Sequence, residues 1–195
     1  MDATLGYLVG HCLIAMPQME DTRFERSVVF LCAHSADGAM GLIVNKPSDA
    51  ITFPQLLSQL ELINDQSIRL PEAAERITVH NGGPVEQGRG FVLHTSDYRL
   101  NEATLNAGAD VCLTATVEIL RAIANGKGPN RAMLALGYAG WEAGQLEREI
   151  AANGWLHCAP DHGLLFDEDD DKKYERAIGK LGINPALLSG AAGNA

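Results

Sequence analysis

Residues 137–156 read GYAGWEAGQLEREIAANGWL and follow an apolar run, Met133 to Leu136. Three glycines and two aromatic residues open the stretch, after which Leu146 and Ile150 stand four residues apart. Glycine lacks a Cβ and can adopt the positive φ angles of tight turns, while a spacing of four places side chains on one face of a helix. The stretch therefore predicts a strand, a glycine turn and then a helix that ends near Gly154.

Upstream of this stretch, the sequence predicts a β-hairpin. Residues 27–34 (SVVFLCAH) are rich in β-branched and apolar types, which favours a buried strand. Asp37-Gly38 is a turn signal, and residues 40–44 form the second strand. Asn45-Lys46-Pro47 ends the hairpin, since proline cannot continue a hydrogen-bond ladder. We also expect an extended segment over residues 8–16.

Further elements follow from the same patterns. Thr52 is a suitable N-cap for a helix that runs to Leu62, with a proline in its first turn. The acidic run over residues 167–171 precedes a helix, and carboxylates are favourable at the positive end of a helix dipole. Its spacing lacks the ligand and glycine pattern of an EF-hand. We also expect a loop over residues 63–76 and a helix over residues 116–125. The remaining expected strands are 77–80, 90–95, 110–115, 155–158 and 161–166. A polar turn containing Gly88 is expected to join strand 77–80 to strand 90–95.

The expected strands outnumber the expected helices, and short turns rather than helices join several of them. That arrangement favours an α+β fold in which helices pack against a mixed, largely antiparallel β-sheet. A chain of 195 residues can bury one sizeable core. We therefore expect a single domain over residues 1–195, with a frayed C-terminal end from about residue 190.

The composition disfavours several classes of function. The formal net charge is −10 and the pI is about 4.9, so the surface repels phosphate backbones and we do not expect nucleic-acid binding. No apolar run approaches the roughly 20 residues of a membrane span, and no secretory signal pattern opens the chain. The four cysteines contain no C-x-x-C pair, which favours buried thiols in a reducing cytoplasm. We expect a cytoplasmic protein that needs no cofactor.

Four blocks of the sequence together resemble the YqgE/AlgH family of bacterial proteins. They are LIAMP at residues 13–17, DGAMGLIVNKP at 37–47, NGGPV with RGFVLH at 81–94, and GYAGWEAGQLEREI with NGWL from residue 137. The blocks span most of the chain in the family's order. The resemblance implies one α/β-type domain and a cytosolic location. One branch of the family is named for a link to alginate regulation, which implies a regulatory role, and the resemblance implies no catalytic residue.

No motif in the sequence specifies a reaction. The glycine turn near Gly140 could hold a phosphate at a helix N-terminus, but it matches neither nucleotide-binding glycine pattern. The histidines His34, His80 and His94 end expected strands and could form a metal or acid–base site if those ends converge. Cys32 shares a strand face with His34 in this prediction. No nucleophile elbow surrounds any serine, so the catalytic residues stay unassigned and no metal ligands are predicted.

We therefore expect a non-enzymatic protein that acts through an interface with a protein or small-molecule partner, in a regulatory role. An enzyme with a site among the strand-end histidines and the glycine turns is the alternative, and a DNA-binding regulator is disfavoured by charge. Glu147 and Glu149 are expected on a solvated helix face, since residues two apart point in different directions. The candidate residues for a shared cleft are His34, Asn45, Lys46, Asn81, Gly82, Gly83, His94, Gly140, Trp141 and Gln145.

Overall fold

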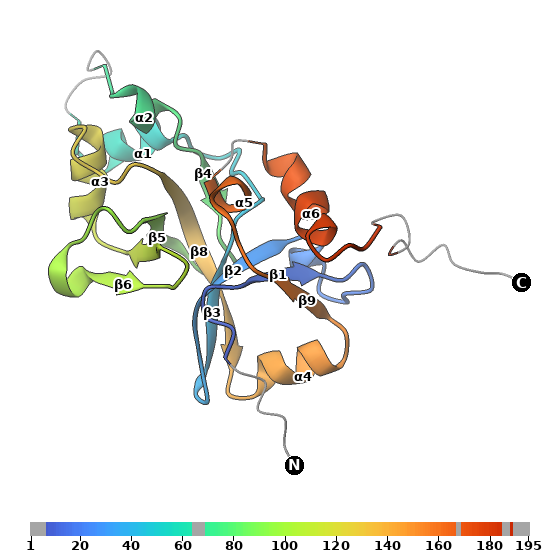
Figure 1. Ribbon diagram of the computed structural model, residues 1–195. Coiled ribbons are helices and arrows are strands. Elements are labelled where there is room, and N and C mark those ends of the chain that lie inside the picture. Colours follow the sequence, from blue (N-terminus) through green and yellow to red (C-terminus); the bar gives the residue numbers. More distant parts are fainter. Residues whose placement is uncertain (1–6, 64–68, 167–168, 185–187, 189–195) are drawn as a thin grey trace, which may run out of the picture.

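The computed structural model describes residues 7–63, 69–166, 169–184 and 188. Within them, nine strands form one curled sheet and six α-helices pack against it, as the α+β prediction requires (Figure 1). The strands are β1 (Cys12–Ala15), β2 (Val28–Ser35), β3 (Gly38–Ile43), β4 (Val79–Asn81), β5 (Val85–Thr95), β6 (Thr104–Asn106), β7 (Val111–Thr114), β8 (Ala132–Glu142) and β9 (Trp155–Cys158). The helices are α1 (Phe53–Gln59), α2 (Glu72–Glu75), α3 (Val117–Ala124), α4 (Gln145–Ala151), α5 (His162–Phe166) and α6 (Asp170–Gly179).

Strand β8 is the spine of the sheet. The strand order is β6-β7-β5-β8-β3-β2-β1-β9, and β4 also pairs with β8. Residues 132–138 of β8 pair with β5, whereas residues 139–142 pair with β3. All these pairings are antiparallel except the parallel β4–β8 pair. One long strand therefore joins the two halves of the sheet, and Figure 1 shows it running through the centre of the molecule.

The predicted glycine turn is wrong in its position. Gly137 and Gly140 both lie inside β8, and the turn into α4 comes only at Gly144, where φ is 70°. The strand continues because β3 supplies pairing partners for its last four residues. Gly140 does not have a positive φ, whereas Gly137 does, at 74°. A Cβ at Gly137 would lie 2.5 Å from the carbonyl oxygen of Gly83, so this position excludes any side chain.

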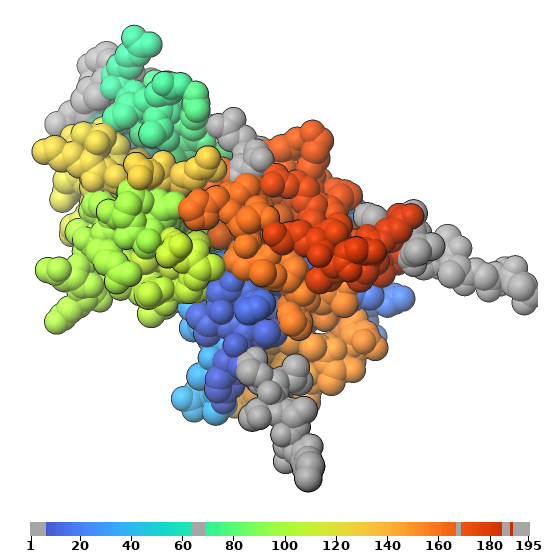
Figure 2. Space-filling view, in the orientation of Figure 1, coloured from blue at the N-terminus to red at the C-terminus, as the bar shows by residue number. Residues whose placement is uncertain are grey.

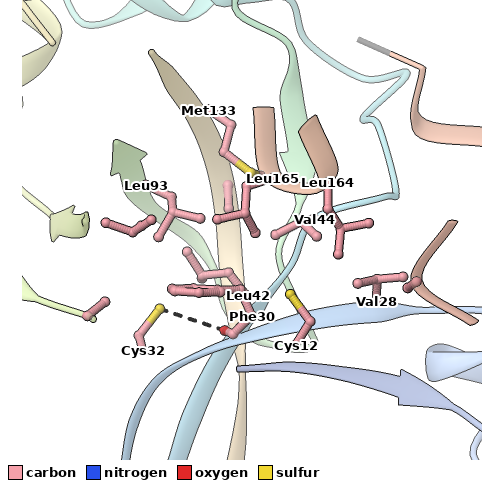
Figure 3. Close-up of a cluster of buried hydrophobic side chains, with 14 of the residues drawn as sticks. Cys12, Val28, Phe30, Cys32, Leu42, Val44, Leu93, Met133, Leu164 and Leu165 are labelled. Carbon is pink, nitrogen blue, oxygen red and sulfur yellow. Dashed lines mark hydrogen bonds between the residues drawn. The ribbon is translucent and has the colours of Figure 1, made fainter. Parts of the chain in front are cut away.

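Each face of the sheet has its own hydrophobic cluster. On one face, residues of β1, β2, β3, β5, β7 and β8 pack beneath α5 and α6, and we name this set cluster 1 (Figure 3). On the other face, Leu146 of α4 and the two tryptophans cover the strands at the β1–β3 end. The same face at the β5–β8 end lies beneath α1, α2 and α3, and we name this set cluster 3. No helix of the described residues is long and apolar enough to cross a membrane.

Several local predictions are confirmed. β2 and β3 form the expected hairpin. Thr52 caps α1 in a reciprocal capping box with Gln55, in which each side chain accepts from the other residue's backbone N–H. The four cysteines are free and buried.

Three segments differ from their predictions. Residues 162–166 form α5 rather than a strand, because Asp161 accepts from the N–H of Leu164 at 2.7 Å and starts a helical turn. The expected loop before residue 77 contains α2. β4 and β5 are not a hairpin, and Gly88 lies within β5. The predicted frayed end beyond residue 190 and the first two acids of the 167–171 run lie outside the described residues.

Candidate functional site

The largest hollow described is an open groove of about 760 Å³ at one end of cluster 1. Its floor is mainly apolar and comes from five strands. The residues that carry the argument are Met40 of β3, Phe91 of β5, Leu105 of β6, Leu113 of β7 and Tyr138 of β8. Figure 2 shows the recess between the green surface of β5 and β6 and the blue surface of the β2–β3 hairpin. Open apolar clefts of this size are the usual form of binding sites.

A wide bulge in β5 forms the rim of the groove. Val85 pairs with Tyr138 and Gly90 pairs with Leu136, so four residues of β5 stand opposite a single residue of β8. Within this segment Glu86 has a φ of 47°, a conformation that a residue with a Cβ rarely adopts. Bulges and strained residues occur next to binding and active sites more often than elsewhere. Glu86 and Arg89 of this segment line the groove.

The charges on the groove walls are mostly negative. Asp37, Glu86 and Glu142 supply three carboxylates, whereas Arg89 is the one cation among the lining residues. The Arg89 guanidinium lies 5.1 Å from the centre of the Phe91 ring and 3.3 Å from a carboxylate oxygen of Glu86. The cation is thus already engaged by a carboxylate and an aromatic face. The groove favours a ligand that brings positive charge.

Trp141 borders the groove and is anchored from behind by Glu149 of α4. Oε2 of Glu149 accepts from the indole N–H of Trp141 at 2.9 Å and from that of Trp155 at 2.8 Å. Oε1 of Glu149 accepts from Nε2 of Gln145 at 2.8 Å, and the side-chain oxygen of Gln145 accepts from the backbone N–H of Glu142. The predicted solvated face for Glu149 is therefore wrong. Glu149 lies on the side of α4 that faces the sheet, and its carboxylate accepts hydrogen bonds from two buried indoles.

His34 lies on the opposite face of β2 from the groove. Its Nδ1 accepts from the N–H of Leu8 at 2.9 Å, so Nε2 carries the proton and donates to Glu147 at 2.9 Å. The pKa of Glu147 is lowered, first by a backbone hydrogen bond within its own residue and further by His34. The register of β2 shifts between Leu31 and Ala33. This bulge turns His34 away from Cys32, so the prediction that they share a face is wrong.

His80 belongs to a buried charged network behind α6. Its Nε2 lies 3.0 Å from both carboxylate oxygens of Asp170, and its Nδ1 lies 3.1 Å from the carbonyl oxygen of Thr78. Both ring nitrogens of His80 therefore face hydrogen-bond acceptors. Lys173, 1% exposed in its side chain, completes the network at 2.8 Å from Asp170 and donates to the carbonyl of Val44. Asp170 is therefore a buried anchor of α6 and not only a favourable charge at its N-terminus.

His94 ends a hydrogen-bond chain of its own. Its Nδ1–H donates to the carbonyl of Thr95 at 2.9 Å, and its Nε2 accepts from the hydroxyl of Thr114 at 2.9 Å. Thr114 in turn accepts from Thr104 at 2.8 Å, which accepts from the N–H of Leu100. Burial lowers the pKa of His94 below its usual value. All these groups are satisfied when His94 is neutral, as expected of a structural residue.

The two Asn–Pro turns pack against each other through their main chains. The N–H of Asn81 donates to the carbonyl of Lys46 at 2.8 Å, and the carbonyl of Gly82 accepts from the N–H of Ile43. Asn45 pins the start of β2 through two hydrogen bonds to backbone groups of residues 26 and 28. The Lys46 ammonium donates to the carbonyl of residue 23. A Cβ at Gly83 would lie 2.1 Å from the main chain of β8, which explains this glycine structurally.

The predicted cleft residues therefore divide among several places. Gly140 and Trp141 line the groove, and Gln145 supports it from behind. The other candidates contact other partners, and none of the three histidines shares a described hydrogen-bond partner with another. Sequence patterns missed the apolar floor and Arg89, although Arg89 and Phe91 lie in the RGFVLH block. One sequence signal could have identified them. Arg89 and Phe91 are two residues apart on a strand, and this spacing places both side chains on the same face.

Two kinds of site, a three-residue metal site and a reactive thiolate, find no support among the described side chains. Residues with placed side chains contain no group of three histidine, cysteine, aspartate or glutamate residues that could hold a metal ion. Burial raises the pKa of Cys32 to about 12 and raises the pKa of Cys12 well above its usual range. Thiols of this kind are poor nucleophiles at neutral pH. The groove offers shape, apolar surface and charge, which are the requirements of binding.

Comparisons with known sequences give close and nearly full-length matches. A family model described as AlgH-like matches residues 12–186. UPF0301 protein blr1492 of Bradyrhizobium diazoefficiens is 61% identical over 194 residues, which cover 99% of this chain and 91% of that protein. A UPF0301 protein of Beijerinckia indica is 58% identical over 194 residues, which cover 99% and 95%.

Solved structures match over the same length. The solution structure of the AlgH protein from Pseudomonas aeruginosa is 40% identical, covers 100% of both chains and gives a TM-score of 0.75. The crystal structure of protein DIP2367 from Corynebacterium diphtheriae gives a TM-score of 0.69 over 96% of this chain and 92% of that one, at 18% identity, and so shares the fold.

Proposed function

The chain belongs to the AlgH-like family, and from that premise we propose that it is a non-enzymatic binding protein whose groove receives a segment of a partner protein. The segment carries apolar side chains and at least one positive charge. The observation that carries the proposal is the opening of cluster 1 to the surface through Met40, Phe91, Leu105 and Tyr138. Leu105 is 49% exposed and lies beside the half-buried Met40 and Tyr138, and apolar clefts of this kind are the usual form of binding sites.

Charge complementarity supports a cationic segment. Among the described residues, no lysine or arginine forms an ion pair with Asp37 or Glu142 on the groove wall, and Arg89 is engaged by Glu86. The whole chain carries a net charge of −10. Basic partners are therefore attracted to this face and acidic ones repelled.

The separate surroundings of the histidines and the raised pKa values of the buried thiols support binding over catalysis. A protein that binds a segment of a partner protein is well suited to the regulatory role that the family resemblance implies. The free, buried cysteines are consistent with action in the reducing cytoplasm, which is part of the proposal.

The proposed function can be tested by selecting peptide ligands from a random library and then mapping where on the protein they bind. Random peptides of about nine residues displayed on phage would be panned on the full-length protein, and the selected peptides titrated by fluorescence polarisation. Leu105→Asp and Glu142→Lys change the groove, whereas Leu181→Asp and Asp49→Lys make the same chemical changes at exposed positions outside its lining. All four variants would be checked for an unchanged melting temperature.

We expect the selected peptides to combine lysine or arginine with large apolar residues. Their Kd should rise by about tenfold or more in Leu105→Asp and Glu142→Lys and stay within about twofold in the controls. Enrichment of acidic peptides, or equal affinity for the groove and control variants, would show that the groove is not the binding surface.

A further inference from the structure

The groove has a counterpart on the other face of the same strands. A second hollow of about 280 Å³ contains Leu60, Gly88, Val92 and Thr114, and it shares Arg89 and Ala115 with the groove. Side chains alternate between the faces of a strand. Phe91 and Leu113 accordingly face the groove and belong to cluster 1, whereas Val92 faces the second hollow and belongs to cluster 3. One edge of the sheet thus lies between two apolar hollows.

Residues 86–89 of β5 have no register partner among the described strands. β7 pairs with β5 only from Val92 to Thr95, because β7 ends at Thr114 and the chain then turns into α3. On the other side of β5 the ladder with β8 skips from Val85 to Gly90. The registers of the described strands therefore give no partner to residues 86–89. Residues 86–89 are exposed, and a Cβ added at Gly88 would meet nothing within 4 Å.

We propose that the partner segment binds in an extended conformation, as a short added strand beside residues 86–89 of β5. Its backbone pairs with N–H and C=O groups of residues 86–89, and its alternate side chains enter the groove and the second hollow. Addition of a strand to an exposed sheet edge takes affinity from main-chain hydrogen bonds and specificity from alternate pockets. Four residues extend over roughly 14 Å, so about two side chains reach each face.

The charges and the opening of each hollow specify the segment further. The second hollow is lined by the exposed aliphatic residues Leu60 and Val117, 41% and 42% exposed, and its only ionisable lining residue is Arg89. It therefore takes aliphatic side chains. The groove adds Asp37 and Glu142 to its apolar floor. It therefore takes the aromatic or cationic side chains at the alternate positions.

This inference rests on the proposed function, and its test uses the peptides selected above. Each peptide would be resynthesised with a single N-methyl group at each position in turn, which removes one backbone donor. Amide hydrogen exchange of Gly88 and its neighbours would be measured in the free and peptide-bound protein. Leu60→Asp would report on the second hollow, with Leu181→Asp as its control.

We expect N-methylation to raise the Kd by about tenfold at alternate positions and by less than about twofold between them. We also expect slower exchange of the amides of residues 86–89 and a higher Kd in Leu60→Asp. If N-methylation changes no Kd beyond twofold, or the selected peptides show helical spacing of their apolar residues, the extended mode is refuted while binding in the groove stands. If Leu105→Asp and Glu142→Lys also bind normally, the proposed function itself fails.

Discussion

Replacing Glu149 with alanine should destabilise the protein strongly, because this carboxylate satisfies two indole groups at once. Trp155 is 2% exposed and Trp141 is 7% exposed, and both indole N–H groups donate to the same oxygen of Glu149. A buried donor left without an acceptor costs about 1–3 kcal/mol. Two such donors, with partial relief by water at Trp141, give an expected loss of about 3–4 kcal/mol in the free energy of unfolding. Glu149→Gln should lose less, since its carbonyl oxygen can still accept from the indoles.

Urea denaturation followed by tryptophan fluorescence is a direct assay, since the only two tryptophans of the chain are the two that Glu149 holds. Glu75→Ala, an exposed glutamate on α2, is the matched control and should change the unfolding free energy by no more than about 0.5 kcal/mol. A loss below about 1 kcal/mol for Glu149→Ala, at an unchanged m-value, would refute the reasoning. The indoles would then have other acceptors.

Two further predictions concern stability. The pKa of Asp170 is lowered overall: burial acts to raise it, but hydrogen bonds from His80 and Lys173 outweigh that effect. The ionised carboxylate therefore stabilises the fold above its unfolded-state pKa, and the gain is lost as pH falls through the lower folded-state pKa. Asp170→Asn should lower the unfolding free energy by about 3 kcal/mol at pH 7 and flatten its acid dependence, measured by urea titrations between pH 3 and 7; an unchanged acid limb would contradict this. Gly137→Ala should cost more than about 2 kcal/mol, since φ is 74° and the Cβ meets a carbonyl oxygen, whereas Gly88→Ala should cost under about 1 kcal/mol. Equal melting temperatures for the two alanine variants would show that β8 adjusts at Gly137.

Local patterns predicted the elements whose signals lie within a few residues. The β2–β3 hairpin follows from a β-branched run and an Asp-Gly turn, and the α1 start follows from Thr52 as N-cap and the proline in the first turn. The end of β8 could not be predicted in this way. Its last residues look like a glycine turn in the sequence and are a strand only because β3 pairs with them. Segment 161–166 likewise has an apolar run that suits a strand or a helix, and a single aspartate side chain decided between them.

The candidate site shows the same limit. The sequence identified Trp141 and the glycines as candidate cleft residues, and it identified the three histidines as candidates for a metal or acid–base site. The fold instead placed each histidine in a separate network, because the strand ends that carry them lie on different faces and edges of the sheet. Arg89 and Phe91 became neighbours of Met40 and Leu105 only when four other strands closed around them.

The sequence by itself determined the family, the α+β class, the acidic charge, the turn of the β2–β3 hairpin and the N-cap of α1. These depend on residue type, on spacing along the chain and on contacts between near neighbours. Tertiary structure decided where β8 ends, which side of β2 His34 faces and where the groove opens. It also decided that Glu149 holds two indoles and that Asp170 is a buried partner of His80 and Lys173. Each of these depends on residues that are distant in sequence and meet only through strand register and packing, and a one-residue bulge such as that at Cys32 reverses the face of every side chain after it.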